Sequence, residues 1–508
     1  MRLPVFFVSL AASAALAQQC PEDLVRYFSQ RNEPFSPGAY EYPYQRIPED
    51  CRTYKVPAIE RVINEAKNNT IADPDLHWLF ANTWPSTVDT TVKWTGYSAD
   101  NPKEELAFII TGDINAMWMR DSSNQLQSYK AVLSSSDDKV AKLFRGAINL
   151  QARYMRRSPY CNAFQPPPES GIPPTFDHAD GDVVKPEYDP DFVFECKYEI
   201  DSLAAFLQLS YDYYHATDDA AFFAEFSWKE AVRSILDVSK GLMEGTYAED
   251  GSINASPYTW ARKSTASTET VANKGTGEPV NGNIGLVRSF FRPSDDSCIF
   301  QYFIPGNMML ARYLKATADI MDTIDEGMAT EMRDMATGIE DAIEEHAIVQ
   351  HPKFGKVYAY EVNGFGSHSL MDDANLPSLL SIPHLGFKGN DDPIYKNTRD
   401  FVLSRWNPYF AYGPVINATG GPHLGPGNGW PMGVITQILT SDDDDEIVGG
   451  IRQLMGSTSG LGLMHETVNS HDETVWTRPW FAWTNGLFGQ MILDLADRKP
   501  HLLKKSYQ

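Results

Sequence analysis

The sequence is poor in positive charge and in cysteine, and it has no long apolar run. Its 43 Lys and Arg stand against 67 Asp and Glu, which gives a formal net charge of −24. A field of that sign argues against a nucleic-acid partner. The apolar stretch from Val5 to Leu16 is shorter than the roughly 20 residues that a transmembrane helix needs, and no later segment reaches that length. We therefore expect no membrane span.

Several catalytic and metal-binding signatures are also missing. The chain has no His-Glu-x-x-His pattern, no zinc-like Cys–His grouping, no Gly-x-Ser-x-Gly elbow, no phosphate loop and no dinucleotide fingerprint. The acidic run from Asp442 to Glu446 lacks the alternation and the glycine of a calcium loop, so we expect it to be a solvated helix start. These absences predict a chain without a bound metal or cofactor.

The first residues have the pattern of a secretory signal peptide. Met1-Arg2 supplies a minimal positive region, an apolar run follows, and Ala15-Leu16-Ala17 fits a small-x-small cleavage site. We expect residues 1–17 to be removed and the mature chain to be secreted or to enter the secretory pathway. Asn-x-Ser/Thr glycosylation acceptors agree with export and begin at Asn68, Asn254 and Asn417.

The 5 cysteines all lie beyond this segment, so at least one stays unpaired or pairs between chains. Cys20 and Cys51 are candidates for a disulfide that staples the N-terminal arm, and Cys161 and Cys196 for a second. We expect Cys298 to be a buried thiol on an apolar helix. Spacing alone does not establish these pairings.

Helical periodicity dominates the chain after an extended, Pro- and Tyr-rich arm at 18–52. Helical patterns cover 54–68, 119–134, 140–154, 200–211, 226–243, 300–320, 326–347, 394–405, 430–440, 446–456 and 481–496. Long Pro/Gly-rich loops, which are usually functional, cover 158–192, 257–295, 356–375 and 406–429. Without a repeat or an interior linker, we expect one all-α domain over 53–508. In it, a closed ring of helical hairpins carries a pocket lined by loops at one end.

Two adjacent acids, Asp295 and Asp296, stand beside Arg292 in the stretch from Phe291 to Cys298. Neighbouring carboxylates repel, so in a partly dry site one of them should hold its proton above the usual Asp range. A carboxylic acid that stays protonated is what a general acid for acetal cleavage needs. The alternative is a helix N-terminus capped by Asp295 or by the serine before it.

Two further clusters lie at expected helix starts. In the first, Trp118 precedes Arg120 and Asp121, whose forked donors and paired acceptors can hold vicinal hydroxyls. The alternative is an Arg–Asp pair with a serine cap. In the second, Glu199 could point into a pocket. The alternative is a simple ion pair between Lys197 and Asp201, four residues apart on a helix.

Two more clusters follow later in the chain. Asp373 belongs to a second acid pair before a helix, with Asn375 close by, and capping is as good an explanation as ligand binding. His465 and Glu466 lie in a short apolar loop near the Trp-rich helix start at Trp483. Glu466 would suit a general base, with His465 beside it to position a hydroxyl. The alternative is a structural His–Glu pair.

These blocks, in this order, resemble the motifs of glycoside hydrolase family 125, whose fungal branch is labelled as meiotically up-regulated proteins. The resemblance runs from about 78 to 495. It implies an (α/α)6 barrel that acts as an exo-α-1,6-mannosidase. The reaction would be metal-independent, inverting hydrolysis of terminal mannose on mannosides or N-glycans. The partner would then be a mannose-containing oligosaccharide or glycoprotein glycan. The arm and the inserts at 158–192 and 257–283 make the chain longer than a minimal member.

The resemblance also assigns roles to residues. The family's acid falls on the Asp295–Asp296 pair, with Asp295 preferred, and its base falls on Glu466, with Glu473 as the main competitor. An inverting pair should lie roughly 6.5–9.5 Å apart, and about 5 Å would indicate a retaining enzyme. The candidates for sugar contact are Trp118, Arg120, Asp121, Glu199, Arg292, Asp373, Asn375, His465 and Trp483.

Two other classes of protein share parts of this pattern. A different helical-barrel glycosidase, such as a calcium-dependent α-1,2-mannosidase or a glucoamylase-like enzyme, would have the same architecture. A non-catalytic mannose-binding protein would keep the aromatic and hydroxyl-binding residues but would not need both acids.

Overall fold

The computed structural model describes residues 20–134, 139–176 and 181–508. The expected signal peptide, residues 1–17, lies outside this range. Within it the helices are α1 Leu24–Phe28, α2 Pro57–Glu65, α3 Pro74–Thr83, α4 Met119–Gln127, α5 Lys139–Arg157, α6 Ile200–Thr217, α7 Ala220–Glu225, α8 Trp228–Gly241, α9 Ala272–Gly275, α10 Ile304–Asp322, α11 Glu326–His346, α12 Ile382–Leu385, α13 Pro393–Val402, α14 Pro431–Leu439, α15 Asp444–Gly456 and α16 Ala482–Arg498.

Short strands connect the helices. They are β1 Val92–Tyr97, β2 Glu105–Ile109, β3 Met117–Trp118, β4 Ala163–Phe164, β5 Val183–Lys185, β6 Val193–Glu195, β7 Thr259–Ala261, β8 Tyr302–Phe303, β9 Ile348–His351, β10 Gly355–Tyr358, β11 Glu361–Val362, β12 His368–Ser369, β13 Phe410–Ala411, β14 Ala418–Thr419, β15 Asn428–Gly429, β16 Thr467–Asn469 and β17 Asp472–Thr477. They pair in sheets of 2 or 3 strands in the described part of the chain. The prediction of a helix-rich chain is confirmed. The prediction that the chain is all-α is wrong, because short strands lie between the helices. Apart from β1, β2 and β17, these strands are two to four residues long, which is too short for an alternating pattern to be detected.

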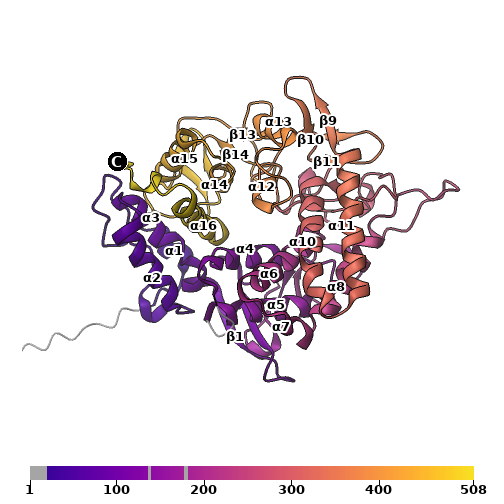
Figure 1. Cartoon of the computed structure of the whole chain (residues 1–508), viewed down its shortest axis with the longest axis horizontal. Helices are drawn as coiled ribbons and strands as arrows, with labels where there is room; N and C mark the ends of the chain where they lie inside the picture. The colour runs from indigo at the N-terminus through magenta and orange to yellow at the C-terminus, as the bar shows by residue number, and fades with distance from the viewer. Residues whose placement is uncertain (1–19, 135–138, 177–180) are drawn as a thin grey trace, which may run out of the picture.

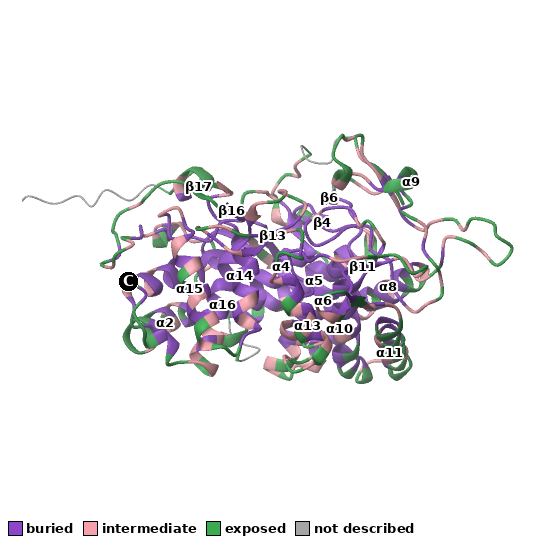
Figure 2. Cartoon of the chain, turned by 90° about the horizontal axis from the view of Figure 1, so that it is seen from above, coloured by how far each residue is buried: buried purple, intermediate pink, exposed green. Residues whose placement is uncertain are grey.

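The helices lie in a ring in the view of Figure 1, and the ring closes where the N-terminal α3 packs against the C-terminal α16. The helix α4 packs against both α6 and α16, α6 packs against α10, and α16 packs against α14. A second set lies outside these: α5 against α6, α11 against α10, and α15 against α14. Figure 2 shows the buried residues concentrated in the middle of the molecule and the exposed ones at its edges.

The helix α4 is unusual because it is polar in sequence and yet entirely buried. Its serine and glutamine side chains find partners inside the protein. Gln151 of α5 donates to Ser122 and to Ser123, each across 3.0 Å, and Gln125 donates to the carbonyl of Ile110 across 3.1 Å. Burial of such groups is tolerated only when they are hydrogen-bonded. The network therefore fixes α4, whose first turn carries Arg120, in its place in the ring between α6 and α16.

The expected disulfides are present, Cys20–Cys51 and Cys161–Cys196. Cys298 is free as expected, but it is half-buried and precedes α10 instead of lying on it. The acidic run before α15 is a helix start, as predicted, with Asp443 capping the helix through the amide of Glu446. The helix α3 was missed because its side chains are buried on nearly every face, which leaves little helical periodicity.

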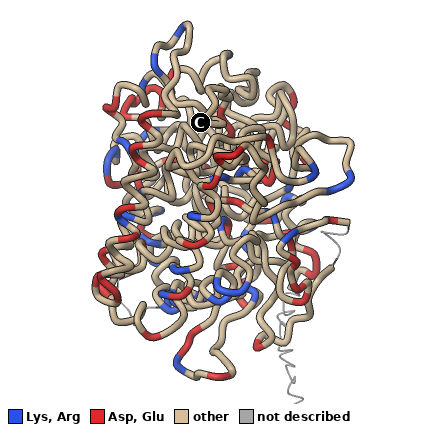
Figure 3. Tube along the Cα trace, turned by 90° about the vertical axis from the view of Figure 1, so that its right-hand side faces the viewer, with Lys and Arg blue, Asp and Glu red and all other residues tan. Residues whose placement is uncertain are grey.

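None of the helices in the described residues is both long enough and apolar enough to cross a membrane. Acidic and basic residues are scattered along the whole trace in Figure 3.

Candidate active site

A pocket with about 430 Å³ of empty space opens where several helices of the ring begin. Its walls come from the starts of α4, α14 and α16, from the turn before α10, and from loops near Asn375, His423 and Glu466. Its lining comprises Thr111, Ile114, Trp118, Arg120, Asp121, Pro293, Ser294, Asp295, Asn375, His423, Trp430, Glu466, Arg478, Phe481 and Trp483. The structure thus brings together both preferred catalytic candidates and most of the expected sugar contacts.

The turn that carries the acid pair is not a helix cap, so that interpretation is wrong. The amide of Arg292 donates to the carbonyl of Asp296 across 2.8 Å, and the amide of Asp295 donates back to Arg292 across 2.9 Å. The helix α10 begins only at Ile304, with no side-chain cap. Asp295 has a φ of 64°, a left-handed conformation that is uncommon outside glycine and that clusters at functional sites.

This turn places the two aspartates in different surroundings. Asp295 lines the pocket, and 27% of its side chain is exposed. The Asp296 side chain is 3% exposed, lies 3.4 Å from Nδ1 of His423, and accepts a hydrogen bond from Ser294 across 3.1 Å. Asp295 is therefore the aspartate of the pair that can meet a ligand, and Asp296 fixes the wall behind it.

Arg120 joins four carboxylates at the pocket wall. Its guanidinium lies 2.7 Å from Glu199, 3.4 Å from Asp201, 3.3 Å from Asp121 and 3.6 Å from Asp295. Burial of these carboxylates close together disfavours the ionised form of some of them, even with the charge of Arg120 between them. The group must therefore hold protons near neutral pH.

Asp295 is not the member of this group whose pKa is raised. Burial raises the pKa of Asp121 and of Asp201 to about 6, and it raises the pKa of Glu199 well above its ordinary value, against the opposing charge of Arg120. Burial acts on Asp295 in the same sense, but the charges of Arg120 and Lys197 outweigh it and lower its pKa. The expectation that the acid pair itself holds a raised pKa is thus wrong for Asp295. Glu199 is the carboxyl of this group whose pKa burial raises well above its ordinary value.

Glu466 lies at the base of the β16–β17 hairpin, where its amide donates to the carbonyl of Thr477 across 3.2 Å. It lines the pocket, and its Oε1 lies 3.4 Å from Nε of Arg478. The other end of Arg478 lies 2.9 Å from Asp113. The competing Glu473 is exposed on β17 and does not line the pocket, so Glu466 is the better-placed base.

His465 does not reach the pocket, which corrects its expected role. Its Nδ1 lies 2.9 Å from the carbonyl of Arg478 and its Nε2 lies 3.1 Å from the carbonyl of Thr458. The ring is fully buried and stacks on Trp476. Both nitrogens are engaged by backbone, so His465 supports the loop and cannot hold a sugar hydroxyl.

Three other expected sugar contacts lie behind the wall. Glu199 is fully buried and holds Arg120. Arg292 pairs with Glu361 across 2.6 Å. Asp373 accepts two hydrogen bonds from Asn375, each across 3.0 Å, and so orients a residue that does line the pocket. None of the three is among the lining residues, because each side chain is turned toward a protein partner.

The expected ion pair between Lys197 and Asp201 is also absent. The helix α6 begins at Ile200, so the two residues are not on one helical face. Lys197 instead lies 3.1 Å from Glu195.

Two charged pocket residues were missed. Arg478 stands beside the Trp-rich helix start, and His423 lies in the long loop at 406–429 that the sequence marks as functional. Burial lowers the pKa of His423, but Asp296, Asp295 and Glu466 outweigh it and raise that pKa to about 9. The imidazole is therefore a cation at neutral pH. The sequence shows that His423 lies in a long loop, but it does not show that His423 pairs with Asp296.

The described residues contain no group of three or more His, Cys, Asp or Glu side chains that could hold a metal ion. The acids that line the pocket lie against arginine side chains: Asp121 and Asp295 against Arg120, and Glu466 against Arg478.

Comparison with known proteins gives concordant matches. A family model described as metal-independent alpha-mannosidase (GH125) matches residues 73–493. The meiotically up-regulated gene 157 protein of Schizosaccharomyces pombe is 47% identical over 490 residues, which cover 96% of this chain and 94% of that protein. Among solved structures, a Streptococcus pneumoniae metal-independent alpha mannosidase in a non-productive complex with alpha-1,6-mannobiose superimposes with a TM-score of 0.76. It is 31% identical, and the match covers 88% of this chain and 99% of that one.

Proposed function

Because the chain belongs to the metal-independent alpha-mannosidases of family GH125, we propose that it is an exo-acting α-1,6-mannosidase that inverts the anomeric centre. The ring of helices is then an (α/α)6 barrel with its pocket at one end. One observation carries the proposal: Asp295 and Glu466, from segments far apart in the chain, line the same small pocket.

In this mechanism Asp295 protonates the glycosidic oxygen as the bond to C1 breaks. Glu466 takes a proton from a water that attacks C1 from the opposite face. The two carboxyl groups then need roughly 6.5–9.5 Å between them to leave room for that water. Arg478, 3.4 Å from Glu466, holds that carboxyl group at the pocket wall.

Asp295 must carry a proton when it acts, although the charges of Arg120 and Lys197 lower its pKa. A sugar in the pocket removes solvent from Asp295, and loss of solvent favours the neutral carboxyl. Glu199 shares Arg120 with Asp295, and burial raises the pKa of Glu199 well above its ordinary value, which favours its protonated form. The proton that Asp295 donates is thus available within the same cluster.

The pocket suits one terminal sugar ring. Trp118, Trp430, Phe481 and Trp483 supply flat apolar walls, while Arg120 and Asp121 offer donors and acceptors to hydroxyl groups. These walls enclose the pocket on several sides, and an enclosed pocket that receives the end of a glycan is typical of exo action.

The substrate class is a terminal mannoside on an oligosaccharide or glycoprotein glycan. The solved relative that holds alpha-1,6-mannobiose supports the 1,6 linkage. Export through the secretory pathway belongs to the same proposal, and the two disulfides support it because such bonds persist in oxidising compartments.

The test is incubation of the protein with α-1,6- and α-1,2-linked mannobiose in the presence of a chelator, followed by proton NMR. We expect hydrolysis of the 1,6 isomer, with β-mannose as the first product and no effect of the chelator. First release of α-mannose would contradict inversion. Preference for the 1,2 isomer with loss of activity under chelation would indicate a calcium-dependent enzyme, and no release of mannose would indicate a binding protein.

A further inference from the structure

The N-terminal arm, residues 20–52, lies outside the span of the family match at 73–493, yet it reaches the active-site hairpin. In Figure 1 this end of the chain lies beside the C-terminal helices α15 and α16. The match to the Schizosaccharomyces pombe protein covers 96% of the chain, so it extends into the arm.

Apolar side chains of the arm pack against both ends of the hairpin that carries the base. Phe28 and Ile47 form a separate buried cluster with Leu463, Trp480 and Ala482. The rings of Phe28 and Trp480 are 4.7 Å apart. Leu463 shortly precedes Glu466 in the chain, and Trp480 shortly follows Arg478. The arm thus contacts the chain on either side of the base and its arginine.

Hydrogen bonds join the same parts. The amide of Gln45 donates to Asn82 of α3 across 3.0 Å, and Asn82 donates to the carbonyl of Pro43 across 2.9 Å and to that of Gly462 across 3.1 Å. Gly462 has a φ of 65°, and a Cβ there would lie 3.1 Å from Tyr42. The arm, α3 and the chain before Glu466 are therefore in direct contact.

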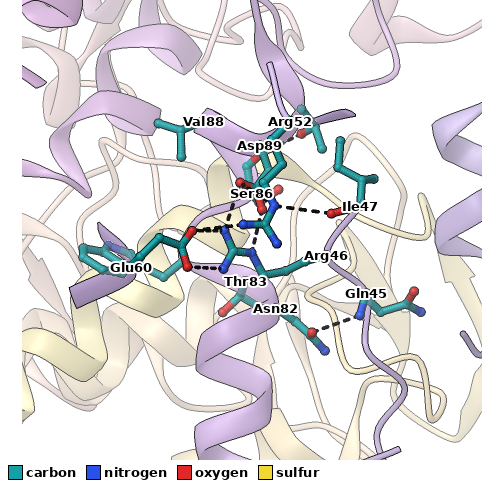
Figure 4. Close-up of polar contacts among 12 residues, drawn as sticks. Gln45, Arg46, Ile47, Arg52, Glu60, Asn82, Thr83, Ser86, Val88 and Asp89 are labelled. Atoms are coloured by element: carbon teal, nitrogen blue, oxygen red, sulfur yellow. Dashed lines mark hydrogen bonds and ion pairs between the residues drawn. The ribbon is translucent and has the colours of Figure 1, made fainter. Parts of the chain in front are cut away.

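Buried charges anchor the arm to the body of the protein (Figure 4). Arg46 contacts Asp89 across 2.7 Å and Glu60 of α2 across 2.6 Å, and both Arg46 and Asp89 have side chains only 4% exposed. Arg52 contacts Glu60 across 3.1 Å and donates to the carbonyl of Ile47 across 3.3 Å. The Cys20–Cys51 disulfide joins the two ends of the arm. With these anchors the arm is a fixed support and not a loose tail.

We propose that the arm is a positioning element for the general base, in which Phe28 and Ile47 hold the hairpin so that Glu466 and Arg478 face the pocket. This inference rests on the proposed role of Glu466. Small displacements of a catalytic group cost on the order of a hundredfold in rate. The arm therefore acts on the water-activating half of the site, while Asp295 is held by separate contacts to Arg120.

α-Mannosyl fluoride separates the two halves of the site. Fluoride leaves as an anion without a proton from Asp295, but the attacking water still gives its proton to Glu466. Asp295→Asn should then lose much less activity on the fluoride than on an α-1,6-mannoside. Glu466→Gln should lose activity on both. These two variants check the proposed function independently of the arm.

The arm is tested with Phe28→Ala, with Phe35→Ala as the matched control. Phe35 is on the same arm but is 41% exposed and is not part of the cluster. We expect Phe28→Ala to lower kcat about tenfold to a hundredfold on both substrates by the same factor, with little change in KM. Rates are compared well below each variant's Tm, so that loss of folded protein does not enter. Phe35→Ala should match the wild type.

Two results would overturn the inference while leaving the proposed function intact: a folded Phe28→Ala variant with the wild-type kcat, or a loss confined to the mannoside. If Phe28→Ala does not fold, Phe28→Leu and Ile47→Val replace it, with the same expected equal loss on both substrates. Wild-type kcat in both of these would be equally decisive against a positioning role.

Discussion

Arg120 donates a hydrogen bond to Glu199 across 2.7 Å inside the pocket wall, and their side chains are only 3% and 0% exposed. The same guanidinium lies 3.6 Å from Asp295 in the pocket. The buried guanidinium of Arg120 thus lies between the candidate acid, Asp295, and the fully buried carboxyl group of Glu199. The charge of Arg120 therefore acts on the pKa of both carboxyl groups.

Replacement of Asp295 by Asn should slow hydrolysis of an α-1,6-mannoside by about 10²–10⁴-fold, because the leaving oxygen loses its proton donor. The circular dichroism spectrum should stay unchanged, since Asp295 lies on a surface turn of the pocket. The measurement is kcat/KM with the wild type in parallel. Near-normal rates would move the acid to Asp296 or to another residue.

Glu466→Gln should abolish most activity, by about 10²–10⁴-fold, because the water loses its base. Glu473→Gln provides the matched control on the same hairpin. Glu473 is exposed on β17, so its substitution should leave kcat/KM unchanged. If instead the Glu473 variant lost activity and the Glu466 variant kept it, the role of general base would pass to Glu473.

Glu199→Gln should lower kcat on mannosides on the order of tenfold or more, since the amide keeps the shape but cannot pass a proton to Asp295. The loss should nearly disappear on α-mannosyl fluoride, which needs no acid. Glu104→Gln is the control, because Glu104 makes a comparable pair with Arg153 across 2.7 Å outside the pocket lining. Equal losses on both substrates would assign Glu199 a purely structural role.

The imidazole of His423 should titrate near pH 9, because the carboxylates of Asp296, Asp295 and Glu466 outweigh the effect of its burial on the pKa. NMR of histidine-labelled protein measures this, and the signal is assigned as the one missing in His423→Asn. In Asp296→Asn the pKa should fall toward its ordinary value of 6.5. A titration near 6.5 in the wild type would contradict the ion pair.

The ion pair between His423 and Asp296 also predicts how the stability of the protein changes with pH. The folded pKa of His423 lies above its unfolded value, so its contribution is complete below about pH 6.5 and is lost as the pH rises through about 9. Urea unfolding should therefore show Asp296→Asn less stable than the wild type at about pH 6. The gap should shrink at about pH 9.5. If the difference in stability between the wild type and Asp296→Asn grew with pH, the raised pKa of His423 would be contradicted.

Much of the fold and part of the site were open to prediction from the sequence. Helices such as α5, α8, α11 and α13 carry one-sided apolar patterns, which are local signals, and their bounds agree with the predicted ranges within a few residues. The site blocks were recognisable because Trp, Arg and acids are uncommon together in short stretches. Both disulfide candidates also proved correct.

The sequence by itself determined the helix-rich class, the family, and which short stretches carry the chemistry. Only the tertiary structure decided that Asp295 faces the pocket while Asp296 pairs with His423, that His465 supports the loop, and that Arg478 accompanies Glu466. The reason is physical. Helical periodicity depends on neighbours a few residues apart, whereas the direction of a side chain in a turn depends on partners that packing brings from distant segments.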